Sequence, residues 1–386
     1  MVKPVDIAPL SARVSDKTVW TFIRLETDDG RVGWGEATLP GCTAQVHAHV
    51  RRLAPAMIGR NWSLPTDVID VVGTCGNDVP EAAAISAIDQ ALWDVMAQVR
   101  GEALAKALGD PQRATIGLYA NINRGTDDRS PAGFAARAID ALASGFDAVK
   151  IAPFDNVQPE DADKTDAATK LSLGLERIAA VREAIGPDVR LLVDCHWRLT
   201  EASAHDVLRE VESLKLHWLE CPVLEEIANF PALRRLRGRA NAMGVRLAGC
   251  EMMIGRQGFQ PFLDAGVYDV IMPDVKYAGG VRELGRIAQA AASHGVACSP
   301  HNPSGPIAHA HSLHVSAHVP LLPFLEIQYG ESPLFFDFVD DSLPHPRFGH
   351  SDLPHGAGLG AGLGGIALRE RLIDVEDATP AREIAQ

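Results

Sequence analysis

Two patterns of apolar and polar positions divide the chain. Over residues 1–40, short runs rich in β-forming residues flank a turn-forming Asp-Asp-Gly triplet, which predicts antiparallel strands. Over 43–59 and 80–108, apolar residues recur at every third or fourth position, which predicts helices. We therefore expect residues 1–113 to form an α+β domain.

From Ala114 onward, short strand-like apolar runs alternate with helical patterns. Eight such runs cover residues 115–122, 146–152, 189–195, 216–221, 245–251, 268–275, 296–301 and 322–328. Helical patterns between them include those over residues 130–145, 167–186 and 280–295. This alternation predicts a barrel of the (β/α)8 type over residues 114–340. An open doubly wound sheet is the alternative, but no Gly-x-Gly-x-x-Gly motif follows the first strand.

The last part of the chain has a different composition. Residues 344–365 are rich in glycine, proline and histidine, which predicts a loop rather than a further strand–helix unit. We expect residues 341–386 to form a C-terminal segment that returns to the N-terminal domain.

Composition narrows the class of protein. A length of 386 residues favours one large and one smaller domain. The formal net charge of −14 argues against nucleic acid or an anionic membrane as partner, since both require a basic surface. The first residues contain no secretory signal pattern, and no apolar run approaches the roughly 20 residues of a membrane span. We expect a cytoplasmic protein.

Acidic and histidine residues follow the ends of successive strand-like runs. They are Asp194, His196, Glu220, Glu251, Asp274 and His301. The first three carboxylates in this series are 26 and then 31 residues apart, which fits one strand–helix repeat each. Carboxylates that meet at one end of a barrel are suited to a hard divalent cation, and histidines beside it are suited to proton transfer. The alternative is that each acidic residue caps the following helix.

Cysteines adjoin three of these carboxylates and raise the alternative of a zinc site. Cys195, Cys221 and Cys250 are each a neighbour of a proposed site residue, although no Cys-x-x-Cys pair occurs. Successive residues of a strand point to opposite faces. If the carboxylates point inward, the thiols are therefore expected to point into the layer between strands and helices.

These features together resemble those of the enolase superfamily. The resemblance lies in the segments 28–36 (DDGRVGWGE) and 82–95 (AAAISAIDQALWDV), the three carboxylates, and the pair Asp274 and His301. It is closest to the mandelate racemase branch and, within it, to the acid-sugar dehydratases that act on galactonate and mannonate. The resemblance implies a modified (β/α)7β barrel with an α+β capping domain. It also implies that Asp194, Glu220 and Glu251 bind Mg²⁺.

The resemblance also implies catalytic roles. His301, paired with Asp274, would remove the proton next to the substrate carboxylate. His196 would protonate the departing β-hydroxyl, as in the Asp-x-His arrangement of the dehydratases. Racemases of this branch carry a Lys-x-Lys pair at the position of Lys150, but Ala152 replaces the second lysine here. That loss favours elimination with a single base over racemisation, and a structural role for Lys150 is the alternative.

Assignments near the end of the barrel and in the loops are less direct. Glu326 resembles the glutamate that hydrogen-bonds the metal-bound carboxylate, and Glu331 is a competitor. Residues that follow strand ends, and are candidates for binding substrate hydroxyls, are Asn121, Asn123, Arg124, Trp197 and Arg198. The cap is expected to contribute to specificity through loops near 14–20 and 37–42. His309, His311 and His314 have helical spacing and are expected on a helix behind the site.

The sequence therefore predicts a Mg²⁺-dependent dehydratase of a sugar acid that forms a 2-keto-3-deoxy acid. A racemase, epimerase or cycloisomerase using the same proton abstraction is the alternative. A non-catalytic acid-binding descendant is a third hypothesis. The expected partner is a small-molecule carboxylate, and by resemblance we expect a homo-oligomer, either a dimer or an octamer.

Overall fold

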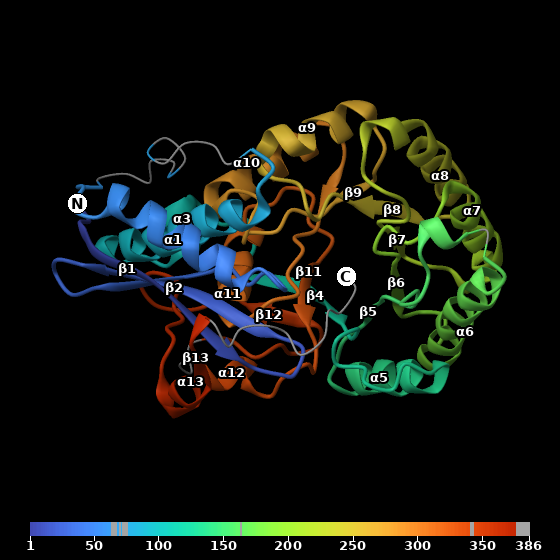
Figure 1. Ribbon diagram of the computed structural model, residues 1–386, viewed down its shortest axis with the longest axis horizontal. Coiled ribbons are helices and arrows are strands. Elements are labelled where there is room, and N and C mark those ends of the chain that lie inside the picture. The colour runs from blue at the N-terminus through green and yellow to red at the C-terminus, as the bar shows by residue number, and fades with distance from the viewer. Residues whose placement is uncertain (63–67, 69–70, 72–75, 163, 340–342, 376–386) are drawn as a thin grey trace.

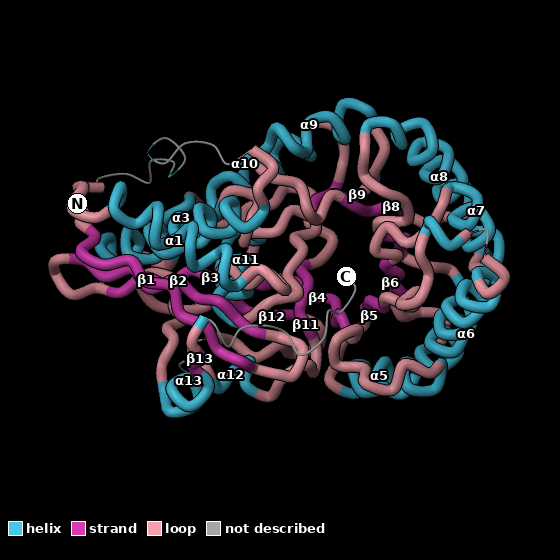
Figure 2. The backbone as a smooth tube through the Cα atoms, in the orientation of Figure 1, coloured by secondary structure: helices cyan, strands magenta, loops and turns pink. Residues whose placement is uncertain are grey.

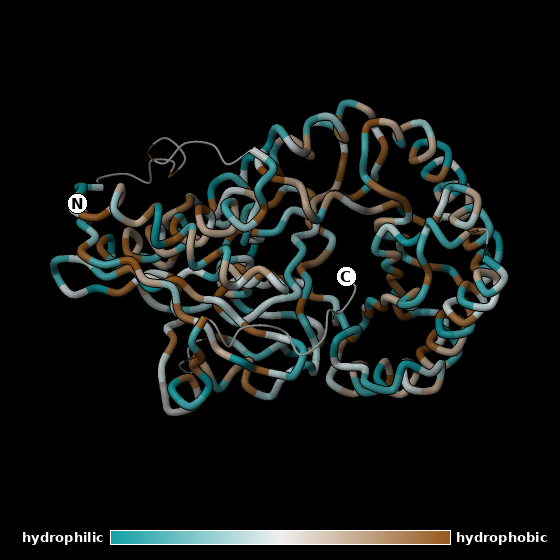
Figure 3. The backbone as a smooth tube through the Cα atoms, viewed as in Figure 1, coloured by the Kyte–Doolittle hydropathy of each residue, from teal (hydrophilic) through white to brown (hydrophobic). Residues whose placement is uncertain are grey.

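Two sheets organise the chain in this computed structural model, which describes residues 1–62, 68, 71, 76–162, 164–339 and 343–375 (Figure 1). Among the described residues, one sheet has four strands in the order β13-β1-β2-β3, and the other has nine. The larger sheet curls into a ring of strands surrounded by helices (Figure 2). Brown and teal alternate along those outer helices, as expected for helices that bury one face (Figure 3).

The N-terminal sheet is antiparallel and is covered by helices. Its strands are β1 (Pro4–Arg13), β2 (Val19–Thr27), β3 (Val32–Glu36) and β13 (Leu372–Ile373). Its helices are α1 (Thr43–Met57), α3 (Val79–Arg100) and α4 (Leu104–Leu108). Helix α3 is capped by Asp78, whose side chain accepts a hydrogen bond from the Glu81 N–H. It packs directly on β3, where a Cβ on Gly35 would lie 2.0 Å from the Ala87 carbonyl oxygen.

Eight strands of the larger sheet form the barrel wall. They are β4 (Thr115–Asn121), β5 (Ala148–Ile151), β6 (Arg190–Asp194), β7 (Trp218–Glu220), β8 (Arg246–Gly249), β9 (Val270–Ile271), β10 (Ala297–Cys298) and β11 (Leu325–Gln328). Neighbours from β4 to β10 pair in parallel, and β11 pairs in parallel with β4. Backbone hydrogen bonds such as Cys298 N–H to Leu321 O link the remaining edge.

A helix follows each of the first seven barrel strands. These helices are α5 (Pro131–Ala143), α6 (Ala167–Ile185), α7 (Glu201–Glu210), α8 (Phe230–Ala242), α9 (Gly255–Ala265), α10 (Gly280–Ser293) and α11 (Pro306–Ser316). Shorter elements are η1 (Pro159–Asp161), η2 (Glu212–Leu214), η3 (Ile227–Asn229), α12 (Leu334–Asp337), β12 (His350–Asp352) and α13 (Gly365–Arg371). The architecture is the (β/α)7β barrel with a separate α+β unit, as expected.

Side chains fill the barrel interior below the strand ends. The interior cluster consists of Tyr119, Ala148, Leu192, Trp218, Ala248, Val270 and Met272. Strand alternation explains its composition, because Leu192 points into this cluster whereas Leu191 and Val193 join the core beneath the helices. The barrel interior is therefore packed rather than open, and active sites of barrels of this type lie at the carboxyl ends of the strands.

Glu36 joins the N-terminal unit to the barrel. Its carboxylate is fully buried at the end of β3 and accepts hydrogen bonds from the N–H groups of Gly305 (2.7 Å) and Ala308 (2.9 Å). These donors belong to the first turn of α11, where a negative charge is favourable. Burial still raises the pKa of Glu36 above its usual value. This contact holds the N-terminal unit against the strand ends that carry the site.

The described C-terminal residues contact both units. Strand β12 pairs antiparallel with β4 of the barrel, whereas β13 pairs antiparallel with β1, with Ser11 opposite Ile373. Part of the expected C-terminal segment, 341–342 and 376–386, lies outside the described residues. The domain boundaries after 113 and 340 remain predictions.

Helix α11 carries the three histidines that the sequence placed behind the site. His309, His311 and His314 are fully buried, and burial lowers the pKa of His309 and His311 to about 3 and of His314 to about 4. Their folded-state pKa values lie below the unfolded value of about 6.5. As pH falls below that value, the unfolded chain takes up protons that the folded chain does not, so acid favours unfolding.

We therefore expect the free energy of unfolding to fall between pH 7 and pH 5. Each of these histidines should contribute up to about 1.4 kcal/mol per pH unit. The variant His311→Gln should reduce the dependence of the free energy of unfolding on pH. Its amide can still donate to the Trp34 carbonyl oxygen, which His311 Nε2 contacts at 2.9 Å. Urea denaturation at several pH values measures this dependence. The exposed His355 gives the control His355→Gln, and an equal slope in both variants would contradict the prediction.

Candidate active site

The sequence-predicted polar residues meet at the carboxyl end of the barrel. Asp194 and Glu220 are the last residues of β6 and β7, and Glu251 follows β8 by two positions. Asp274 and His301 form a parallel β-bridge just beyond β9 and β10. Lys150 lies on β5 and Glu326 on β11, and all of these side chains are buried.

Lys150 lies among three of the carboxylates. Its Nζ is 2.7 Å from Glu220 Oε1, 3.1 Å from Glu326 Oε1 and 3.7 Å from Asp194 Oδ2. Burial alone would lower the pKa of Lys150, but Glu220 and Glu326 outweigh it and raise the pKa well above its usual value. Lys150 is therefore a buried ammonium that partly neutralises the strand ends.

Both oxygens of Glu220 are already engaged in this structure. Oε1 accepts from Lys150, and Oε2 accepts from the indole Nε1–H of Trp218 at 2.9 Å. Burial raises the pKa of Glu220 to about 8, because desolvation exceeds the attraction of Lys150. Glu220 is thus turned toward Lys150 in the barrel interior.

Glu326, rather than Glu331, faces this group. The Glu326 carboxylate accepts hydrogen bonds from Asn121 Nδ2 at 2.6 Å and from the Asn302 N–H at 2.9 Å. Burial opposes ionisation of Glu326, but Lys150 and His301 hold its pKa below the usual value. Glu331 instead contacts Thr18 of the N-terminal unit and lies 3.8 Å from Arg124. Asn121 therefore orients Glu326.

His301 and Asp274 form the expected pair. His301 Nδ1 lies 2.8 Å from Asp274 Oδ2, so this nitrogen carries the proton when the ring is neutral. Nε2 then faces the other carboxylates, 3.6 Å from Glu251 Oε2 and 3.9 Å from Glu326 Oε2. Burial lowers the pKa of His301, which keeps the ring neutral and able to accept a proton.

Two neighbours of this pair were missed by the sequence reasoning. Lys276 Nζ lies 2.5 Å from Asp274 Oδ2, and the Tyr277 hydroxyl lies 3.2 Å from His301 Nδ1. Burial would raise the pKa of Asp274, but Lys276 and His301 lower it below the usual value. Strand alternation gave no signal for Lys276, because it follows Asp274 in a turn, where the Lys276 N–H donates to Asp274 Oδ1 at 2.8 Å.

His196 contacts Asp194, although not through strand geometry. Strand β6 ends at Asp194, and His196 and Trp197 adopt positive φ values of 46° and 56°. The turn places His196 Nε2 3.0 Å from Asp194 Oδ2 and lets the His196 N–H donate to Oδ1 at 2.9 Å. Burial opposes ionisation of Asp194, but His196 and Lys150 hold its pKa well below the usual value. The His196 side chain is 26% exposed, so it reaches solvent.

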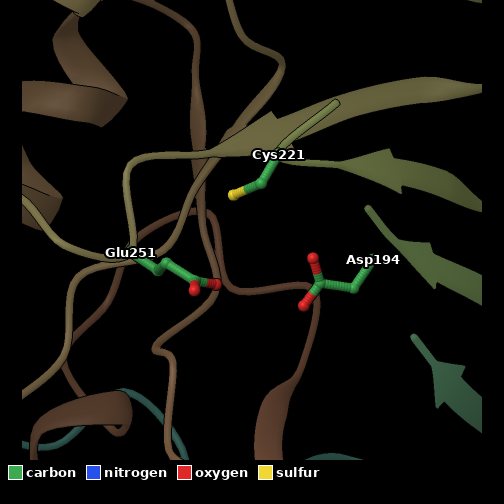
Figure 4. Close-up of side chains that lie close together, drawn as sticks. All are labelled: Asp194, Cys221 and Glu251. Carbon is green, nitrogen blue, oxygen red and sulfur yellow. The ribbon is translucent and has the colours of Figure 1, made fainter. Parts of the chain in front are cut away.

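One cysteine departs from the expected orientation. Cys195 and Cys250 lie in the core between strands and helices, as expected, and Cys298 of β10 lies there too. Cys221 instead points toward Asp194 and Glu251 (Figure 4), and its Sγ and one oxygen of each carboxylate all lie within 4.8 Å of one another. The prediction for Cys221 was wrong because its φ of 44° turns the chain at the end of β7, where strand alternation stops.

The donor set at this end of the barrel fits a divalent cation. Five buried carboxylates, from Asp194, Glu220, Glu251, Asp274 and Glu326, face two buried lysines, Lys150 and Lys276. Glu251 Oε2 is buried and has no hydrogen-bond partner among the described residues. Burial, and then the neighbouring Asp194 and Glu220, raises the pKa of Glu251 well above its usual value. A cation beside Glu251 would satisfy that oxygen and balance the charge.

The loops around the site connect the two units. Lys17 Nζ, from the loop near residues 14–20, lies 2.7 Å from Asp127 Oδ1, and Thr18 contacts Glu331. Arg124 Nη1 donates to the Pro303 carbonyl oxygen at 2.9 Å. The loop near residues 14–20 thus lies against the loops that follow β4 and β11. This loop is one of the two through which the N-terminal domain is expected to contribute to specificity.

Comparison with known proteins identifies related families and structures. Residues 1–109 match the family described as "Mandelate racemase / muconate lactonizing enzyme, N-terminal domain", and residues 133–364 match "Enolase C-terminal domain-like". The chain is 32% identical over 350 residues to D-galactonate dehydratase of Xanthomonas euvesicatoria pv. vesicatoria, covering 86% of this chain and 88% of that protein. It is 33% identical over 300 residues to D-galactonate dehydratase of Verminephrobacter eiseniae, covering 77% and 75%.

Solved structures give the same architecture. A member of the enolase superfamily from Salmonella Typhimurium superposes with a TM-score of 0.84 at 25% identity, covering 97% of this chain and all of that one. The 3,6-anhydro-D-galactonate cycloisomerase of Zobellia galactanivorans gives a TM-score of 0.82 at 25% identity, covering 96% and 100%. Among the described residues, no helix combines the length and apolar character needed to cross a membrane.

The arrangement around Lys150 predicts a conditional loss of stability. Lys150→Met would leave Glu220, Glu326 and Asp194 without their buried ammonium, so the chelator-treated protein should lose about 3–5 kcal/mol of unfolding free energy. A saturating divalent cation should restore part of this loss. Urea denaturation with EDTA or Mg²⁺ measures both effects. The surface lysine Lys106 gives the control Lys106→Met, which should behave like the wild type, and a small loss in Lys150→Met with EDTA would contradict the interpretation.

Proposed function

Because the chain belongs to the mandelate racemase / muconate lactonizing enzyme family of the enolase superfamily, we propose that it dehydrates a sugar acid to a 2-keto-3-deoxy acid. The chain is an enzyme, of the hydro-lyase class to which its dehydratase relatives belong. The single observation that carries the proposal is the placement of two histidines on the carboxylate group. His301 Nε2 faces Glu251, and His196 Nε2 contacts Asp194.

A divalent cation, proposed to be Mg²⁺, would bind at the buried carboxylates. Asp194 and Glu251 offer oxygens to it, and Glu220 would join them by turning from Lys150. When bound, the cation supplies a positive charge that stabilises negative charge on the substrate carboxylate. Lys150 and Lys276 together carry too little charge to do this for five carboxylates and a substrate anion.

His301 is proposed to act as the base. Its Nδ1–H donates to Asp274, which leaves Nε2 with a lone pair directed at the site. Nε2 would take the proton from C2 of the aldonate, and Tyr277 and Lys276 would hold the pair in place. The electron pair of the C2–H bond then becomes available to form the C2–C3 double bond.

His196 is proposed to act as the acid. Hydroxide is a poor leaving group, so breaking the C3–O bond requires a proton donor. His196 would give its proton to that oxygen, which leaves as water while the C2–C3 double bond forms. The resulting enol takes a proton at C3 to become the 2-keto acid. Solvent access at His196 provides a route for its reprotonation.

The position of Ala152 argues against a second base from β5. Lys150 points at Glu220 and Glu326, and two residues later the chain carries a buried alanine without a proton acceptor. Racemisation requires a base on each face of the substrate, whereas elimination requires one base and one acid. Lys150 is instead proposed to position Glu326 and the substrate carboxylate by charge.

A cycloisomerase is the second candidate, favoured by one observation. The similar structure from Zobellia galactanivorans is that of a 3,6-anhydro-D-galactonate cycloisomerase. Such a reaction would use His301 in the same way and yield a product isomeric with its substrate.

The reaction class is tested by product mass. A panel of aldonates and anhydro-aldonates, incubated with the enzyme and Mg²⁺, should yield a product lighter by one water that reacts with a carbonyl reagent. EDTA should abolish turnover, and added Mg²⁺ should restore it. A product of unchanged mass would favour the cycloisomerase, and turnover that persists after thorough chelation would contradict the cation site.

The roles of the two histidines are tested by separating proton abstraction from elimination. With a substrate found in the panel, His301→Asn should lower both dehydration and exchange of the C2 proton with deuterated water by about 10²–10⁴-fold. His196→Asn should lower dehydration by a similar factor while exchange persists. The buried His309 gives the control His309→Gln, which should retain both reactions. Loss of exchange in His196→Asn would reverse the assignment.

Several expectations stay predictions. They are the domain boundaries after residues 113 and 340, a homo-oligomeric state and a cytoplasmic location. The identity of the aldonate depends on contacts from the loops near 14–20 and 37–42.

A further inference from the structure

The Glu220 carboxylate has two partners of different kinds. Its Oε1 accepts a hydrogen bond from the Lys150 ammonium at 2.7 Å, and its Oε2 accepts one from the indole Nε1–H of Trp218 at 2.9 Å. Glu220 and Trp218 are both fully buried. In the proposed cation site Glu220 turns from Lys150, so the second hydrogen bond decides how the carboxylate is held when it does so.

The strand itself places the indole beside the carboxylate. Trp218 and Glu220 are the first and last residues of β7, and residues two apart on a strand share a face. Trp218 belongs to the packed interior of the barrel, where its ring meets Tyr119 edge-on with the ring centroids 5.5 Å apart. The indole N–H is therefore a donor whose position is fixed by packing.

The two hydrogen bonds differ in how readily Glu220 can give them up. Lys150 has two other carboxylates nearby, because its Nζ lies 3.1 Å from Glu326 Oε1 and 3.7 Å from Asp194 Oδ2. The Trp218 N–H donates to Glu220, and a buried N–H that loses its acceptor costs about 1–3 kcal/mol. The bond to the lysine is thus the easier one to exchange.

We propose that Trp218 is a positioning residue of the cation site, because it holds Glu220 Oε2 while Oε1 turns from Lys150 to the cation. Glu220 then offers one oxygen beside Asp194, its neighbour in register on β6, and keeps the other on the indole. A hydrogen bond to the second oxygen of a ligand fixes the direction of the first. The proposal rests on the proposed cation site, with Glu220 as a ligand, but not on the reaction.

The same exchange releases a donor of Lys150. In this structure the ammonium donates to Glu220 Oε1, and that N–H becomes free when Oε1 turns away. Lys150 can then donate it to the substrate carboxylate, the partner proposed for it above. Glu220 thus exchanges one positive partner for another, while the indole keeps the carboxylate in place.

The test is a Mn²⁺ titration of the chelator-treated full-length protein, with free Mn²⁺ measured by electron paramagnetic resonance. Mn²⁺ suits the same carboxylate ligands as Mg²⁺. Trp218→Phe, which removes the N–H and keeps an aromatic ring, should weaken Mn²⁺ binding by about 10–100-fold. Trp62 is also buried, but its Nε1 has no hydrogen-bond partner among the described residues. The control Trp62→Phe should therefore bind Mn²⁺ like the wild type.

A double-mutant cycle separates this role from a role in packing. Glu220→Gln should weaken Mn²⁺ binding by itself, and adding Trp218→Phe to it should cause a further loss of about threefold at most. If Trp218 only filled space, the 10–100-fold loss would recur in the Glu220→Gln background, and that result would overturn the proposal. Equal Mn²⁺ affinity in Trp218→Phe and the wild type would overturn it too.

Nuclear magnetic resonance of the wild type tests the retained hydrogen bond even if a variant fails to fold. In protein labelled with ¹⁵N-tryptophan, the indole proton of Trp218 should resonate at lower field than that of Trp62, whose N–H has no partner among the described residues. It should stay there when Mg²⁺ is added. A shift to the Trp62 position on Mg²⁺ addition would contradict the proposal. A wild type that meets these expectations but dehydrates no sugar acid would contradict the proposed function alone.

Discussion

The structure depends on a concentration of buried negative charge at one end of the barrel. A lone carboxylate in an apolar interior is costly, and here five lie within a few strands of one another. Three kinds of contact compensate this negative charge. Lys150 bridges Glu220, Glu326 and Asp194, Lys276 pairs with Asp274, and backbone or side-chain N–H groups hold Glu326. The carboxylate that lacks such a partner among the described residues is Glu251, and a cation bound there would contribute to the fold as well as to the proposed chemistry.

The turns at the strand ends decide which atoms face that charge. His196, Trp197, Cys221 and Cys250 all have positive φ values, and each follows the end of β6, β7 or β8. A strand that continued straight would alternate its side chains, whereas these turns direct a histidine and a thiol toward the carboxylates. Glu36 supports the same region from the other side, because it docks the N-terminal unit on the first turn of α11. Backbone conformation and interdomain packing therefore act together to shape the site.

Much of this could be predicted from the sequence. Spacing and strand-end position located the carboxylates and the His301–Asp274 pair, and strand–helix alternation gave the barrel. The prediction failed where a rule of regular strands was applied beyond the end of a strand, as for Cys221. Contacts between residues that are distant along the chain could not be predicted either. The Trp218 and Lys150 bonds that occupy Glu220, and the Thr18 contact that removes Glu331 from the site, depend on how strands and loops fold together.

The two proposed proton-transfer residues differ in environment in a way that suits elimination. His301 is buried, and its Nδ1 is bonded to a carboxylate that Lys276 keeps ionised, which leaves Nε2 as the proposed proton acceptor. His196 lies at the solvent-facing side of the same carboxylate group, where a proton given to the leaving oxygen can be replaced. A racemase would need two bases in comparable environments on opposite faces of the substrate. This site combines one buried histidine with one that is partly exposed, an asymmetry that suits the proposed loss of a proton from one carbon and of hydroxide from the next.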